Sequence, residues 1–225
     1  MITLHHCPQT RSMRTLWLLY ALDVDFNLRT YPFDRTLRSP EFLALSPAGR
    51  VPALEIDLDP IFETGAITEY LCERFSPNGL GRAPGGPERG TWLVWVHFAE
   101  TISQHAAALT QQHVALREDH MRSAIVMKLE AARIGKCYAA VEARLAALSG
   151  PEPYLLESGF TAADISVGQA VYMSRYFVRT DGYPALCDWY ARITAREDFK
   201  RALPAGDGIY AQDFYAPWPI EERTE

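Results

Sequence analysis

The chain has 225 residues, a formal net charge of −6, and 48% hydrophobic against 22% charged residues. This length gives room for one large domain or two small ones, each with a core. An acidic chain lacks the positive surface that a phosphate backbone needs, so nucleic acid is not an expected partner. No stretch approaches the roughly 20 apolar residues that cross a bilayer, and the opening MITLHH lacks a signal-peptide pattern. We expect a cytoplasmic protein with no membrane partner.

The cysteines and histidines do not suggest a metal site. The four cysteines are far apart in sequence and form no C-x-x-C pair: Cys7, Cys72, Cys137 and Cys187. The six histidines contain no H-E-x-x-H. His5 and His6 are adjacent, so on a strand they face opposite sides and cannot share a metal ion. We expect no metal ligands.

Residues 1–75 alternate β-prone runs with helical patterns. Strands are predicted in 1–6, 26–33, 51–57 and 60–62, and helices in 11–23, 39–46 and 63–75. Helix 11–23 is apolar nearly all round, which predicts burial on several sides. Helices separate the first three strands, which favours parallel pairing. The last two strands are joined by a short turn, which predicts an antiparallel hairpin.

The rest of the chain is helical in pattern. Residues 76–90 are rich in Gly and Pro, which is typical of a linker. Long helical patterns follow in 88–114 and 121–148, which predict an antiparallel pair of a bundle, and shorter ones in 160–177 and 183–196. The tail 206–225 is rich in aromatic residues and shows no hydrophobic periodicity. We predict a domain in 1–77, a linker in 78–88 and an all-helical domain in 89–225.

Three motifs together resemble the cytosolic glutathione S-transferases, of the bacterial type. SPAGRVPAL (46–54) is similar to the family pattern N-P-x-G-[KRQ]-V-P-x-L, ETGAI (63–67) to E-S-[GA]-A-I, and FTAADIS (160–166) to F-[ST]-x-A-D-[IL]-[ST]. Each alone is weak, but their order and separation are specific. The resemblance implies an α/β thioredoxin-like N-terminal domain followed by an all-α helical bundle. The third motif predicts only a capping box, with Thr161 and Asp164 starting a core helix.

The first two motifs imply a site for glutathione as co-substrate. In the family the proline at Pro52 follows a cis bond, and the backbone of Val51 pairs with the tripeptide like an added strand. Glu63 and Thr64 hold the γ-glutamyl end, at a helix N-terminus that suits a carboxylate. The alternative for Glu63 and Thr64 is an ordinary helix cap, and for Pro52 a plain strand start.

Three charged residues are further candidates for this site. Arg50, and more weakly Arg38, would pair with the glycyl carboxylate. Glu100 matches a position that in bacterial relatives reaches the γ-glutamyl ammonium of the neighbouring subunit, which implies a homodimer. The alternative for each is a solvated surface charge.

The stretch HHCPQTRSMR (5–14) holds the candidates for thiol activation. A thiol is mostly protonated at neutral pH, so a transferase needs a donor aimed at the sulfur. The theta-like pattern S-x-x-x-R fits Thr10 and Arg14, which places Thr10 in the serine slot. Ser12, Arg11 or backbone N–H groups nearby are expected to share the role. Cys7 precedes this slot by three residues.

These observations predict a glutathione transferase that adds the glutathione thiolate to a small, hydrophobic electrophile and serves detoxification. The electrophile is expected between the domains, near residues 7–12, the helix from Trp92 to His105, Tyr172 or Tyr176, and the aromatic tail. One alternative is a glutathione-dependent thiol or disulfide reductase that uses Cys7. Another is a binder of glutathione or hydrophobic ligands without catalysis.

Overall fold

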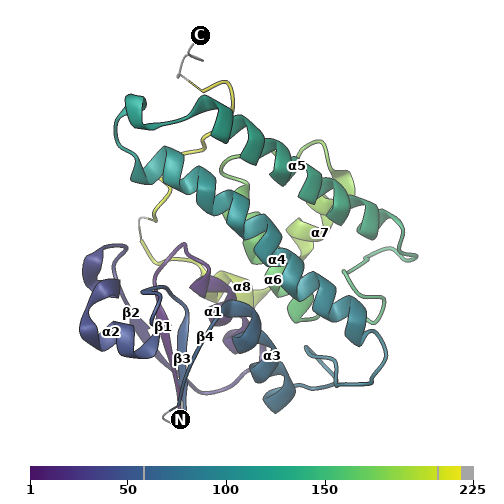
Figure 1. The fold of residues 1–225 in the computed structure, drawn as a ribbon. Coiled ribbons are helices and arrows are strands. Elements are labelled where there is room, and N and C mark those ends of the chain that lie inside the picture. The colour runs from purple at the N-terminus through teal and green to yellow at the C-terminus, as the bar shows by residue number, and fades with distance from the viewer. Residues whose placement is uncertain (58, 207, 219–225) are drawn as a thin grey trace.

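A four-stranded mixed sheet forms the base of the N-terminal half (Figure 1). The computed structural model describes residues 1–57, 59–206 and 208–218. Strand β1 (Ile2–His6) pairs in parallel with β2 (Asn27–Thr30) and antiparallel with β3 (Ala53–Ile56). The parallel pairing expected for the first three strands is thus confirmed for β2 and wrong for β3. Strand β4 (Asp59–Phe62) pairs antiparallel with β3, which confirms the predicted hairpin; residue 58 of its turn lies outside the described residues.

Three α-helices accompany this sheet. They are α1 (Ser12–Ala21), α2 (Pro40–Leu45) and α3 (Thr64–Phe75), with a 3-10 turn at Arg35–Arg38 before α2. Ser39 caps α2 by accepting the backbone N–H of Phe42 at 3.3 Å, as its sequence predicts. In Figure 1, α2 lies at the outer end of the sheet, whereas α1 and α3 lie toward the helical half.

Helix α1 joins the two halves of the molecule. Its residues 12–19 are all buried, which confirms the burial predicted from its apolar sequence. The indole N–H of Trp17 donates to Asp198 at 2.9 Å, so α1 is tied to the C-terminal helices. Gly168 permits this close packing, because an added Cβ would lie 3.2 Å from the Trp17 ring and 2.5 Å from Ile193.

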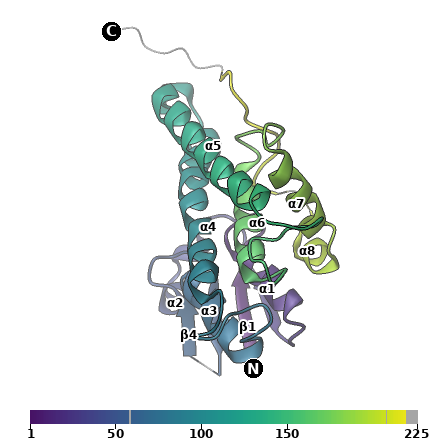
Figure 2. The ribbon, with the colours of Figure 1, turned by 90° about the vertical axis from the view of Figure 1, so that its right-hand side faces the viewer.

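The second half is a bundle of helices. The long α4 (Arg89–Thr110) and α5 (Ala124–Ala146) run antiparallel (Figure 1), as predicted. Behind them lie α6 (Ala162–Ser174), α7 (Pro184–Thr194) and α8 (Glu197–Ala202) (Figure 2). Helix α4 continues into a π-helical turn at Gln111–Ala115, and a 3-10 turn follows at Asp119–Met121.

Helix α6 is the centre of the bundle, because each of its residues is buried. The predicted capping box starts it: the Thr161 hydroxyl accepts from Ala163, and Asp164 accepts from the Thr161 backbone at 2.8 Å. Asp164 also accepts from the indole of Trp189 at 2.9 Å. These bonds confirm the predicted capping box and fix the start of this core helix.

The predicted fold class is therefore confirmed, a thioredoxin-like domain followed by a helical domain. The segment predicted as a linker lies between the end of α3 and the start of α4. The domain limits at 77 and 89 stay a prediction. Of the predicted tail, residue 207 and residues 219–225 lie outside the described residues. Among the helices described, none combines the length and the apolar sequence that crossing a membrane requires.

Candidate functional site

A cavity of about 780 Å³ lies where the two halves meet. Eight of the ten residues predicted for the site line it: Thr10, Arg11, Arg38, Arg50, Val51, Pro52, Glu63 and Thr64. The two predicted residues outside its lining are Ser12 and Glu100. The opposite wall comes from the helical half, including Ser103, Thr110, Val114, Met173 and Tyr210. Residues far apart in sequence thus converge on one cavity.

The Val51–Pro52 peptide bond is cis, as the resemblance implies. Sheet pairing on this strand begins at Ala53, opposite His5 and Phe62. The backbone of Val51 therefore lies at the cavity wall, just beyond the part of the strand that is paired.

Glu63 and Thr64 stand at the start of α3 without capping it. Glu63 occupies the N-cap position with no side-chain capping bond, and its φ of +76° is rare for a residue other than glycine. Such backbone conformations gather at functional sites. Thr64 is buried at the first helical position. The ordinary capping role considered for these residues is therefore not realised, and the N-terminal end of α3 faces the cavity.

Arginines form the outer rim of the cavity. Arg50 and Arg38 are exposed and line it, as does Arg35, which sequence reasoning missed. Arg35 belongs to the 3-10 turn that the sequence did not predict. Asp34 lies beside it in the lining. The excess of positive charge on this rim suits an anionic ligand.

Thr10 precedes α1 by two residues and opens onto the cavity. Its hydroxyl donates to the Cys7 carbonyl at 2.7 Å and accepts the Ser12 backbone N–H at 3.3 Å. Ser12 is fully buried behind it, with the two hydroxyl oxygens 2.8 Å apart. A bound ligand would therefore meet Thr10, and Ser12 would act on it only through Thr10.

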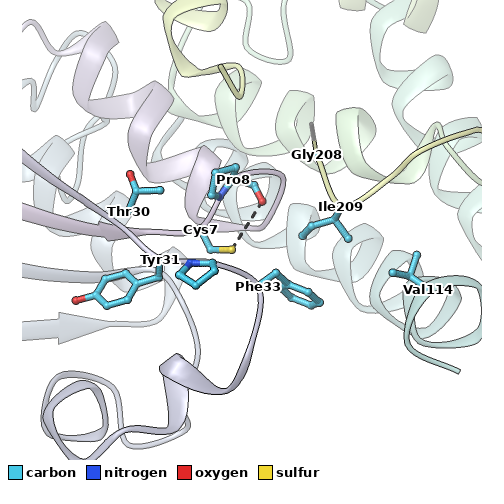
Figure 3. A pocket seen from close by; sticks show the side chains of 9 residues that line it. Cys7, Pro8, Thr30, Tyr31, Phe33, Val114, Gly208 and Ile209 are labelled. Atoms are coloured by element: carbon cyan, nitrogen blue, oxygen red, sulfur yellow. Dashed lines mark hydrogen bonds between the residues drawn. The ribbon is translucent and has the colours of Figure 1, made fainter. Parts of the chain in front are cut away.

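Cys7 directly follows β1 and lies off the start of α1. Burial, with a smaller contribution from Asp34, raises the pKa of its thiol to about 11. All four cysteines are free, and the Cys7 sulfur makes a long contact of 3.9 Å with the Pro8 carbonyl (Figure 3). At neutral pH this thiol is protonated and a poor nucleophile.

A second, mainly apolar cavity of about 470 Å³ adjoins the first (Figure 3). The two share Phe33, Val114 and Ile209 in their linings. Tyr31 also lines the second cavity but turns its hydroxyl away from Cys7, toward His5 Nδ1 at 2.8 Å. The surface left for a ligand is therefore hydrophobic.

Glu100 is held by two arginines of its own chain. Its carboxylate contacts Arg14 at 2.5 Å and Arg11 at 2.9 Å. Burial would raise the pKa of this carboxyl, but Arg14 and Arg11 outweigh it and hold the pKa below the usual value. This pairing within one chain gives Glu100 a local role that the sequence did not reveal.

The α4 stretch predicted near the electrophile, Trp92 to His105, meets the larger cavity at Ser103. Trp92 is fully buried and its indole donates to the Leu80 carbonyl at 2.9 Å, so it belongs to the core. The cavity is instead lined by the later residues of α4, from Ser103 onward, and by Val114 of the π-helical turn. The reason is geometric, because only the C-terminal end of this long helix reaches the cavity.

Gln9 lies in the stretch 7–12 predicted near the electrophile, but the sequence assigned it no role of its own. It is buried with φ +51°, and its amide donates to the hydroxyls of Tyr172 at 3.2 Å and Tyr176 at 3.1 Å. Its carbonyl accepts the backbone N–H of Tyr210 at 3.0 Å. Both tyrosines predicted near the electrophile are thus engaged by Gln9, which lines the cavity itself. No local pattern marks such contacts between distant segments.

Both halves of the chain match known protein families. Residues 1–73 match the family described as "Glutathione S-transferase, N-terminal domain", and residues 105–197 match "Glutathione S-transferase, C-terminal domain". The chain belongs to the glutathione S-transferase family. Together the two matches cover well over half of the chain.

Full-length relatives agree with this assignment. Glutathione S-transferase F13 of Arabidopsis thaliana is 28% identical over 205 residues, covering 85% of this chain and 89% of that protein. The crystal structure of glutathione transferase F7 from Populus trichocarpa superposes with a TM-score of 0.75 at 25% identity, covering 90% of this chain and 97% of that one. The predicted class, a glutathione transferase enzyme, is therefore confirmed.

A more distant structure shows the fold alone. A glutathione transferase homolog from Lodderomyces elongisporus, solved with two GSH per subunit, has a TM-score of 0.80 at 18% identity. It covers 89% of this chain and 96% of that one.

Proposed function

We propose that this protein binds glutathione in the larger cavity and transfers its thiolate to a small, hydrophobic electrophile. The observation that carries the proposal is the convergence of eight predicted residues on that one cavity. The γ-glutamyl carboxylate would meet the uncapped start of α3 at Thr64, with Glu63 near its ammonium. The glycyl carboxylate would meet the rim at Arg50, with Arg38 and Arg11 adding positive charge.

The chemistry follows from the place of Thr10. With the tripeptide held at both ends, its sulfur would lie against the Thr10 hydroxyl, beside the N-terminal end of α1. The thiol proton leaves to water, and the hydroxyl donates to the thiolate. The sulfur then attacks the electrophile and forms a C–S bond. At an aryl halide the halide departs with its electron pair, whereas at an activated alkene the π bond breaks and the carbanion takes a proton from water. A donor that favours thiolate over thiol raises the rate at neutral pH.

The electrophile would occupy the apolar cavity that adjoins the glutathione site. Its lining includes Phe33, Val114 and Ile209, the residues that it shares with the larger cavity. A small hydrophobic substrate suits this lining because the burial of its apolar surface would provide most of its affinity. A role in detoxification is consistent with so general a recognition of electrophiles.

The finer assignment is a theta-like variant with Thr10 in the serine slot, acting as a homodimer. Thr10 keeps the hydroxyl of serine and lines the cavity, which supports the assignment. For the dimer, the support is the exposure of apolar side chains on β4, α3 and α4: Phe62, Tyr70 and Val94. Glu100 gives less support than expected, because both its oxygens pair with arginines of its own chain.

The reductase alternative needs a reactive Cys7, and the raised pKa of its buried thiol argues against it. Titration calorimetry with glutathione, together with conjugation assays on a panel of aryl halides and activated alkenes, tests the proposal. We expect binding and formation of the thioether. Binding without turnover on the whole panel would favour a non-enzymatic binder, and disulfide reduction that Cys7→Ala abolishes would favour the reductase.

A further inference from the structure

A chain of three buried or half-buried side chains leads from the cavity to the interior of the sheet. The hydroxyls of Thr10 and Ser12 are 2.8 Å apart, and Ser12 Oγ lies 2.8 Å from His6 Nδ1. His6 is the last residue of β1 and is 4% exposed. Of the three, Thr10 alone lines the cavity. His6 therefore reaches the cavity only through Ser12 and Thr10.

The protons in this chain can be counted. Ser12 Oγ accepts the backbone N–H of Cys7 at 3.1 Å, which uses one of its two lone pairs. If His6 Nδ1 carries a proton, it donates to the second lone pair. The Ser12 proton then goes to Thr10 at 2.8 Å rather than to the more distant Cys7 carbonyl at 3.1 Å. The Thr10 oxygen, having accepted this bond, keeps its own proton, which here goes to the Cys7 carbonyl at 2.7 Å. Rotation of the Thr10 hydroxyl would turn this proton from the carbonyl to a sulfur bound in the cavity.

The opposite tautomer gives the opposite result. An unprotonated Nδ1 is an acceptor and competes for the single Ser12 proton. Thr10 would then lose the bond from Ser12 that makes its own hydroxyl a stronger donor. The position of one proton on His6 thus determines which way the hydroxyl bonds point.

We infer that His6 is a positioning residue for thiol activation: its Nδ1–H fixes Ser12, which in turn directs the Thr10 hydroxyl at the glutathione sulfur. This inference rests on the proposed function. His6 touches neither glutathione nor the electrophile. It acts by setting the direction and strength of the donor that does.

The surroundings of His6 suit this role. Burial lowers its pKa to about 4, so the imidazole is neutral at the pH of catalysis and holds one ring proton. The neighbouring His5 lies on the other face of β1, where its ring contacts Glu55 at 2.7 Å and Tyr31 at 2.8 Å. His5 is buried to the same degree without any contact to Ser12 or Thr10 among its hydrogen bonds, which makes it a matched control.

The first test measures the pKa of the thiol of bound glutathione from its thiolate absorbance. His6→Phe keeps a ring and removes the donor; we expect the thiol pKa to rise by about one unit and turnover at pH 6.5 to fall about 10-fold. His6→Asn places an amide N–H near the same position. It should bring turnover back to within about threefold of the parent, and the thiol pKa to within about half a unit. His5→Phe should leave the thiol pKa unchanged. A thiol pKa that is unchanged or lower in His6→Phe overturns the inference.

A double-mutant cycle separates this role from a general structural effect. In the Thr10→Val background, adding His6→Phe should not move the thiol pKa further, because the path ends at Thr10. Equal and additive shifts in both backgrounds would show that His6 acts by another route and overturn the inference. The proposed function is tested separately by the thiolate absorbance of glutathione bound to the parent protein. If the parent shows no bound thiolate, the function itself is contradicted.

A measurement on the unaltered protein gives the tautomer directly and needs a variant only to assign the signal. Nitrogen-15 spectra of histidine-labelled protein report which ring nitrogen carries the proton, and loss of one signal in His6→Asn assigns it among the six histidines. We expect a protonated Nδ1 on His6. A proton on Nε2 alone overturns the inference, whatever the kinetics show.

Discussion

Arg14 and Glu100 form an ion pair of 2.5 Å that ties α1 to α4 directly behind the cavity. The Arg14 side chain is 1% exposed, and its other guanidinium nitrogen donates to Ser103 at 3.0 Å and to Gln169 at 3.2 Å. A buried cation of this kind is costly without a charged partner. Glu100 is therefore needed for the packing of α1 against the helical domain, whatever it contributes to a ligand.

The first prediction concerns the stability that this pair provides. Glu100→Gln should lower the free energy of unfolding at pH 7 by about 1.5–3 kcal/mol, the range for a hydrogen bond to a charged group. This loss of stability should be smaller than for a wholly buried pair, since the Glu100 side chain is 34% exposed. Urea denaturation of parent and variant measures the difference. A matched control is Glu197→Gln, whose exposed pair with Lys200 should contribute little.

The pH dependence of this effect has a definite sign. The pKa of Glu100 is lowered in the folded state, so its stabilisation is complete above the unfolded value of 4.5 and is lost as pH falls through the lower folded value. The difference between parent and Glu100→Gln should therefore shrink below about pH 4.5. A difference that stays constant into acid would show that the charge on Glu100 is not what stabilises the fold.

Much of the fold was predictable because its signals are local. Ser39 before Pro40 marks the start of α2, Thr161 with Asp164 marks the start of α6, and the apolar period marks the long helices. Helix α8 escaped prediction, since its six residues EDFKRA carry no apolar period. The sequence could not narrow the predicted α4 stretch 92–105 to the residues that line the cavity, because an apolar residue such as Trp92 suits a core and a cavity wall equally well.

The site was predictable where a motif marks it and not where distant segments meet. Val51, Pro52, Glu63 and Thr64 belong to motifs, and all four line the cavity. The contacts of Gln9 with residues 172, 176 and 210 join segments that only the folded chain brings together. The same holds for the pairing of Glu100 with α1.

The second prediction concerns Thr64. Thr64→Ala should weaken glutathione binding by about 1.5–3 kcal/mol, about 10- to 150-fold in Kd, since it removes a hydrogen bond to a charged carboxylate. Stability should change little, because no side-chain bond caps α3. Titration calorimetry and thermal unfolding measure the two effects.

Thr68→Val, one turn along α3, is the control: it removes a hydroxyl bonded to the Thr64 carbonyl and should leave the affinity for glutathione unchanged. Unchanged affinity in Thr64→Ala would contradict the assignment of ETGAI to the γ-glutamyl end.

The third prediction concerns assembly. Light scattering at micromolar concentration should give about twice the chain mass of 25.3 kDa. Val94 is 60% exposed on α4, beside α3, and α3 is tied to α4 by the contact of Glu69 with His97 at 2.9 Å. Val94→Asp should therefore shift the mass toward the monomer, because it places a charge in an apolar interface. Ile125→Asp, at a residue that is 66% exposed and lies in the first turn of α5, should leave the mass unchanged. A monomeric parent would contradict the homodimer.

The fourth prediction decides which side chain activates the thiol. Thr10→Val removes the hydroxyl and keeps the shape, so turnover at neutral pH should fall about 10- to 10³-fold, the range for the loss of one oriented donor. Affinity for glutathione should change less, because the ends of the tripeptide are held elsewhere. Cys7→Ala should leave conjugation nearly intact, since the thiol with a pKa of about 11 is protonated and lies off the start of α1. Initial rates of conjugation and calorimetric affinities for the parent and both variants give the comparison. If Cys7→Ala is inactive and Thr10→Val is active, the chemistry belongs to the cysteine and the protein is a reductase. If both variants are active, the activating donors are Arg11 or the backbone N–H groups at the start of α1.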